Sequence, residues 1–237
     1  MVLEKMALVG DALSHVALPG LAIGFLLNIN PFIGGFAFLF VSAVIIWYVQ
    51  RITKISFEAL VGAAFTSALA LGIILLREDP EALFEALFGD ITTVVVWDAI
   101  AAVVVSIVAI LLTRLIYRKL VLAMISEELA ISKGIDVAKT NLLYLFLVCT
   151  VVAVGIKIVG TLLVGFLVVV PAIAAKNLSS DMRKYALFGS VFGGVSAFSG
   201  VFLASYFGLE PGPVVVFSGI AIFAVTTIVS WRMKTAV

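Results

Sequence analysis

About eight apolar runs divide this chain, and most of its charged residues lie in the short segments between them. A helix needs about 20 mostly apolar residues to cross the hydrocarbon core of a bilayer, and the runs approach this length. Only 12% of the residues are charged, against roughly a quarter in soluble domains, and 64% are hydrophobic. The sequence therefore predicts an all-α, polytopic membrane helix bundle in which residues 1–237 form one transmembrane domain. The expected spans are Val16–Asn28, Phe32–Val49, Ala59–Leu76, Ala99–Ile116, Leu142–Ile156, Ile158–Ala175, Tyr185–Phe207 and Val214–Trp231.

The basic residues indicate an orientation. Cytoplasmic loops carry an excess of lysine and arginine, and assigning the basic loops to the cytoplasm leaves only Arg77 and Lys157 on the other side. We therefore expect a multi-pass protein of the cytoplasmic (inner) membrane with both termini in the cytoplasm. The acidic segment Arg77–Asp98, with leucine and phenylalanine at helical spacing, is then an amphipathic helix on the outer surface. Its acidic residues either attract cations or a docking protein, or they lie outside only because the cytoplasmic retention of loops acts on basic residues and not on acidic ones.

A polar cytoplasmic segment, Ser126–Thr140, interrupts the apolar pattern in the second half of the chain. Ser126 followed by two glutamates suits a helix start, and Gly134 suits a helix end. A short helix here has no membrane to cross. It is either an ordinary loop helix or a contact with a cytoplasmic partner.

The stretch Gly10–Gly20, GDALSHVALPG, holds Asp11 and the only histidine of the chain, His15. Residues four apart share one face of a helix, so a carboxylate and an imidazole could reach one small cation. The structural alternative is that Asp11 caps a helix and His15 packs or hydrogen-bonds a neighbour. An ionisable residue beside a membrane span is costly, which favours a partner or a pathway.

Four motifs carry a resemblance to a known family. GDALSHVALPG, the ALFGD of Ala86–Asp90, the EELAISKGI of Glu127–Ile135 and the KIVGTLLVGFLVVVPAIAA of Lys157–Ala175 resemble the ABC-3 permease subunits of bacterial metal-ion importers. The resemblance implies a type II ABC importer permease-like fold and a homodimer that moves zinc, manganese or iron(II). It also implies a separate cytoplasmic ATPase subunit and an extracytoplasmic metal-binding protein as partners, beside membrane lipid. We expect no nucleic-acid partner.

The resemblance also assigns residues. It makes Asp11 and His15 a transient metal site on the translocation path, and it makes the segment with Glu127, Glu128, Leu129 and Gly134 a coupling helix that docks on the ATPase. Family members usually carry further hydrophobic helices before the GDALSH motif, so we expect this chain, which begins nine residues ahead of the motif, to lack the family's first helices.

Other classes of protein remain as alternatives. A siderophore or cobalamin permease would share the fold, and an ion-coupled secondary transporter would place several ionisable residues at mid-membrane, usually with internal repeats. A membrane enzyme would need a catalytic cluster, which one histidine hardly supplies. The single cysteine, Cys149, excludes a disulfide framework, and the sequence contains no GxxxxGK[ST] pattern for ATP binding. We expect no catalytic residue, no permanently bound cofactor, and ATP hydrolysis on another subunit.

Overall fold

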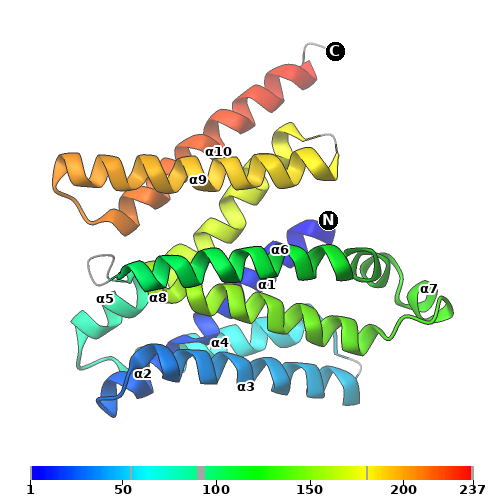
Figure 1. Cartoon of the computed structure of the whole chain (residues 1–237), viewed down its shortest axis with the longest axis horizontal. Coiled ribbons are helices and arrows are strands. Elements are labelled where there is room, and N and C mark those ends of the chain that lie inside the picture. Colours follow the sequence, from blue (N-terminus) through cyan, green and yellow to red (C-terminus); the bar gives the residue numbers. More distant parts are fainter. Residues whose placement is uncertain (1, 54, 90–93, 180, 236–237) are drawn as a thin grey trace. The chain divides into compact units, whose positions relative to one another are not determined.

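The computed structural model describes residues 2–53, 55–89, 94–179 and 181–235, and these ranges are helical with short connections and contain no strand. The chain divides into two compact units, residues 1–161 and 162–237. Figure 1 labels the helices. They are α1 (Val2–Val16), α2 (Leu18–Leu26), α3 (Pro31–Ile52), α4 (Phe57–Leu75), α5 (Pro80–Phe88), α6 (Val96–Ile125), α7 (Glu127–Ser132), α8 (Val137–Leu178), α9 (Met182–Phe207) and α10 (Pro211–Thr235).

Seven helical stretches in the described ranges are long and apolar enough to span a membrane, so the predicted all-α polytopic fold is confirmed. Two of the eight expected spans lie within one helix, α8. The 42 residues of α8 consist of two helical parts that meet at a kink, so each part can supply one span. The expected spans Leu142–Ile156 and Ile158–Ala175 place the break between them at Lys157, and this position is wrong. Helical geometry is instead interrupted at Gly160, which has φ 75° and ψ 171°.

The first apolar stretch is divided between two helices. α1 ends at Val16 and α2 begins at Leu18, with Ala17 between them and a proline in the first turn of α2. After α2 the chain turns at Asn28, which has φ 53°. The Asn30 side chain then caps α3 by accepting a hydrogen bond from the Phe32 amide at 3.0 Å. These local signals fold α2 and α3 into a helical hairpin.

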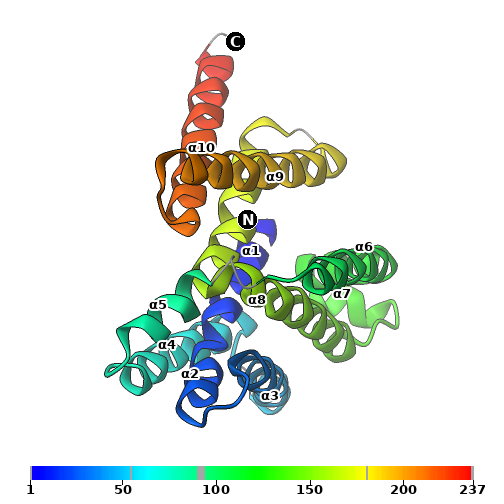
Figure 2. The ribbon, with the colours of Figure 1, turned by 60° about the vertical axis from the view of Figure 1, so that its left-hand side comes forward.

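Small residues bring the backbones of the hairpin into direct contact. A Cβ on Gly20 would overlap the Gly34 carbonyl and would come within 2.6 Å of the Phe38 Cβ. Gly72 of α4 likewise receives Leu18 of α2. Close approach through glycine is the usual packing mode of membrane helices. α2 therefore lies against both α3 and α4, as Figure 2 shows, and 67% of Val9–Leu26 is buried.

The segment 77–98 contains a shorter helix than its pattern suggests. α5 covers nine residues, starts with Asp79 as N-cap and Pro80, and buries one face through Ala82 and Ala86. Asp98 lies in the first turn of α6. Residues 90–93, including Asp90 of the ALFGD motif, lie outside the described residues.

Two glycines join the end of α5 to the interruption in α8. Gly89 has φ 69° and ψ 177°, and Gly160 has a similar conformation, which is essentially restricted to glycine. A Cβ on Gly89 would lie 2.7 Å from the Gly160 amide nitrogen. Nearby, Lys157 donates a hydrogen bond to Asp98, so an ion pair connects α8 with the start of α6. The interruption in α8 thus coincides with its contact to α5.

The second unit contains residues 162–178 of α8 together with α9 and α10. Gly200 of α9 meets the backbone of Val215 on α10, and Ser196 donates a hydrogen bond to the Val215 carbonyl at 3.0 Å. Gly189 and Gly193 face residues of α8, whereas no atom lies within 4 Å of a Cβ on Gly194. Gly189, Gly193 and Gly200 of α9 therefore lie in helix interfaces.

Candidate functional site

The candidate site is the pair Asp11 and His15 near the carboxyl end of α1. The helix is continuous through both residues, so their spacing of four places them on one face. The His15 Nε2 atom lies 3.9 Å from the Asp11 Oδ1 atom. Two metal–ligand bonds of about 2.1 Å each reach up to about 4.2 Å, so one ion fits between these atoms. The structure brings the two predicted residues together.

The surroundings fix His15 more firmly than Asp11. The His15 side chain is 14% exposed and the Asp11 side chain 37% exposed. The imidazole meets the edge of the Phe65 ring on α4, with centroids 5.4 Å apart. The Leu13 and Ser14 side chains are fully buried, and the Ser14 hydroxyl donates a hydrogen bond to the Asp11 carbonyl at 2.7 Å. Packing thus holds the imidazole while the carboxylate stays accessible.

The electrostatic position of the pair favours a cation. Asp11 is the group of the pair that can carry a negative charge, and its side chain is 37% exposed, whereas the neighbouring imidazole is largely buried. The carboxylate therefore attracts a cation to the position of His15.

The pair lacks the features of a tight, permanent metal site. No group of three or more His, Cys, Asp or Glu residues that could hold a metal occurs in the part of the chain that the structure describes. The buried Nδ1 atom of His15 has no hydrogen-bond partner among those residues. Permanent sites usually have three or four protein ligands and an outer partner on the second imidazole nitrogen. Asp11 and His15 can contribute two ligands of a weak or shared site.

The short helix expected after Ser126 is present as α7. The Ser126 hydroxyl accepts a hydrogen bond from the Leu129 amide at 3.2 Å and so caps the helix. Glu127 and Glu128 occupy the exposed first turn, and the Leu129 side chain is 45% exposed. After α7 the chain turns at Gly134, which has φ 75°. The predicted helix is confirmed, and its glutamates and Leu129 face away from the protein core.

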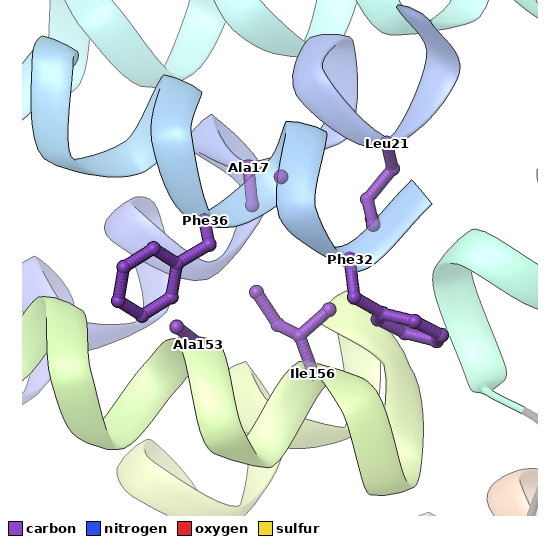
Figure 3. A pocket seen from close by; sticks show the side chains of 7 residues that line it. Ala17, Leu21, Phe32, Phe36, Ala153 and Ile156 are labelled. Carbon is purple, nitrogen blue, oxygen red and sulfur yellow. The ribbon is translucent and has the colours of Figure 1, made fainter. Parts of the chain in front are cut away.

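A small recess lies close to the interruption between α1 and α2, but it is apolar. Figure 3 shows six of its lining side chains. Its volume is about 10 Å³, room for about one water molecule. Its lining offers no carboxylate, imidazole or thiol, so it does not extend the candidate ion site. The lining residues are Ala17, Leu21, Phe32, Gly35, Phe36, Ala153 and Ile156.

Sequence reasoning missed two contacts around the site. Phe65 is separated from His15 by fifty residues, and nothing in an apolar run marks which aromatic residue will meet the imidazole. Trp47, close to the predicted end of a span, donates its indole N–H to the Ala138 carbonyl at 3.0 Å. The two residues are 91 positions apart, and no sequence signal marks their contact.

Comparisons with known proteins agree along the whole chain. The model of the ABC 3 transport family matches residues 1–230. The manganese import system permease protein ScaB of Streptococcus gordonii is 31% identical over 235 residues, which are 98% of this chain and 84% of that protein. The high-affinity zinc uptake system membrane protein ZnuB of Buchnera aphidicola is 29% identical, over 95% of this chain and 88% of that protein.

A solved structure has the same fold. PsaBC from Streptococcus pneumoniae, determined in complex with Fab, superposes with a TM-score of 0.76 at 30% identity, over 95% of this chain and 82% of that chain. The sequence and structural similarities both extend over the motifs and the helices described above. The chain belongs to the ABC 3 transport family.

Proposed function

We propose that this protein is the permease subunit of an ABC importer that carries divalent metal ions into the cell. The observation that carries the proposal is the match to the family over residues 1–230. Relatives over nearly the whole chain are named as manganese permeases and as a zinc uptake membrane protein. The Asp11–His15 pair supplies chemistry that suits such cargo.

The ligand set supports manganese, zinc or iron(II) as cargo. Carboxylate oxygen and neutral imidazole nitrogen accept all three ions, and no thiolate is involved that would favour copper(I) or hold zinc tightly. A transport site must bind well enough to admit an ion and weakly enough to release it. Each protomer offers two ligands separated by 3.9 Å, with no group of three or more possible ligands in the described residues, and this fits that requirement.

In the proposed path, each of two protomers contributes one Asp11–His15 pair. In a homodimer, the Asp11 and His15 side chains of both protomers would together offer four ligands, enough for a complete but transient coordination shell. The ion would pass along α1, whose span is the most buried of the seven candidate spans. A site shielded from lipid in this way also strengthens the attraction between carboxylate and cation.

The proposed energy source lies outside the chain. A separate ATPase subunit hydrolyses ATP in the cytoplasm and docks on α7, through the exposed Glu127, Glu128 and Leu129. Both termini then lie in the cytoplasm, as the distribution of lysine and arginine indicates. An extracytoplasmic metal-binding protein delivers the ion to the opposite side, where the acidic residues of 77–98 would face it.

Uptake of radioactive manganese tests the proposal. The permease is reconstituted with its ATPase in vesicles, and Asp11→Ala and His15→Ala are compared with wild type. Loss of either ligand should reduce uptake by about tenfold or more. Glu210→Ala removes an exposed carboxylate far along the sequence and should leave uptake unchanged. Manganese uptake at the wild-type rate in both ligand variants, with the complex intact, would contradict the assignment of the pair.

A further inference from the structure

Trp47 connects the end of α3 to the start of α8. Its indole Nε1 atom donates a hydrogen bond to the Ala138 carbonyl at 3.0 Å, across 91 positions of sequence. A tryptophan that anchors a span at the membrane surface turns its N–H toward water and headgroups. This N–H is satisfied inside the protein, whereas the neighbouring Tyr48 is 57% exposed. The Trp47 side chain therefore has a role between helices.

Charged groups order both sides of the same contact. The Arg51 guanidinium carbon lies 5.7 Å from the centre of the Trp47 ring, within the range of a cation–π interaction. Asp136, two residues before Ala138, accepts a hydrogen bond from the Lys139 amide at 3.0 Å and forms an ion pair with its side chain. These Lys139 contacts, and the Arg51 charge to a lesser extent, hold the pKa of Asp136 below its usual range. The hydrogen bond from Trp47 to Ala138 therefore joins two helix ends that are each ordered by a local contact, Arg51 over Trp47 on α3 and Asp136 with Lys139 before and in α8.

The start of α8 is tied closely to α7. Only Lys133–Asp136 separate the two helices. The Ile135 amide donates to the Ala130 carbonyl at 3.0 Å, and the Gly134 amide donates to the Ile131 carbonyl at 2.9 Å. A link this short, with its amides bonded back to the helix, transmits displacement instead of absorbing it. Movement of α7 should therefore displace Ala138.

The other end of α3 reaches the helices of the candidate site. Thirteen residues of helix, about 20 Å, separate Trp47 from Gly34. Gly34 and Gly20 pack backbone against backbone, with no side chain between them that could give way. Gly20 follows His15 by five residues, just past the interruption at Ala17. A shift of α3 along or about its axis would therefore act directly on the junction of α1 and α2.

We propose that Trp47 is a positioning residue that couples α7 to the Asp11–His15 pair, through its hydrogen bond to Ala138 and the contact of α3 with α2. The inference rests on the proposed function, because it assigns a route by which ATPase movement reaches the ion. The Trp47 ring touches no cargo. Its hydrogen bond makes α3 move together with the start of α8.

Replacing Trp47 by phenylalanine tests the route, because Trp47→Phe keeps an aromatic ring for Arg51 but removes the N–H donor. The measured quantity is manganese taken up per ATP hydrolysed by the permease–ATPase complex in vesicles. We expect this ratio to fall about fivefold, the factor for losing one hydrogen bond of typical net strength. A protein that is only destabilised loses uptake and ATP turnover together and keeps the ratio.

Trp97→Phe is the matched control, since Trp97 is 75% exposed, and it should keep the wild-type ratio. A second measurement uses the reciprocity of coupling between two sites. Addition of manganese to the wild-type complex in detergent should change the amide hydrogen exchange of residues 127–140, and Trp47→Phe should abolish that change.

The outcomes separate the two proposals. If the wild-type complex imports none of manganese, zinc and iron(II), the proposed function fails and the coupling role fails with it. If the wild type imports manganese and Trp47→Phe keeps both the wild-type ratio and the exchange response, only the role of Trp47 is overturned. A lowered ratio in Trp97→Phe as well would also refute it, because the effect would then not depend on the bond to Ala138.

Discussion

Replacing Gly160 by alanine should destabilise the junction between α5 and α8. The loss of unfolding free energy should exceed the loss that an unfavourable backbone conformation alone would cause. Gly160 has φ 75° and ψ 171°, a region of backbone space that is essentially restricted to glycine. The added Cβ would also meet the backbone of α5, with the Leu87 carbonyl oxygen at 2.5 Å. Backbone atoms cannot rotate away as a flexible side chain can, so the helices themselves must move apart.

Two contributions set the expected magnitude. Holding a residue other than glycine in a sparsely populated backbone region costs about 1–3 kcal/mol. Forcing an extra carbon into a closely packed contact costs typically 1–3 kcal/mol more. Gly160→Ala should therefore lower the free energy of unfolding by about 2–6 kcal/mol.

Gly208→Ala is the control for conformation alone. Gly208 has φ 64° and ψ 35°, and no atom lies within 4 Å of its Cβ position. Alanine there should cost about 1–2 kcal/mol. Reversible unfolding of the purified permease in mixed detergent micelles, followed by circular dichroism, gives both values. A loss in Gly160→Ala no larger than that in Gly208→Ala would refute the close contact between α5 and α8.

Two further predictions concern residues of the first unit. Lys157→Met should destabilise the fold because it leaves the Asp98 carboxylate, which is 13% exposed, without its partner. In the same unfolding measurement, the double variant Asp98→Asn/Lys157→Met should lose less unfolding free energy than the sum of the two single variants. Additive losses would argue against the ion pair. Cys149 is fully buried, so it should resist a maleimide reagent in the folded permease and react on unfolding; rapid labelling of the native protein would contradict its position against α3.

The sequence predicts the spans well because charge and apolarity are strong signals. The beginning of α3 at Pro31 and its end at Ile52 lie within three residues of the predicted limits, since Asn30 and Arg51 mark the ends of an apolar run. The interruption in α8 could not be placed from the sequence. Gly155 and Gly160 both stand in apolar surroundings, and Lys157 suggested a loop, yet Lys157 is accommodated by Asp98, 59 positions away. Only the three-dimensional contact with Gly89 distinguishes the two glycines.

The candidate site shows the same division between local and distant information. The spacing of Asp11 and His15 in a helix suffices to predict that they face one ion, and their side chains are 3.9 Å apart. The Ser126 cap of α7 is equally local. Phe65 beside His15, and Ala138 beside Trp47, depend on which helices become neighbours. Hydrophobic periodicity predicts a buried face but not the element that covers it.

The contact between Gly20 and Gly34 also bears on how the protein enters the membrane during synthesis. The span Val9–Leu26 has a mean hydropathy of 1.4, the lowest of the seven, whereas the following span, Pro31–Ile52, has 2.3. A weakly apolar segment partitions poorly into lipid by itself. The turn at Asn28 and the glycine contact allow the two to leave the translocation machinery as a preassembled pair, with the more apolar helix shielding the other. The glycines that bring the first span close to its neighbour would then also secure its insertion.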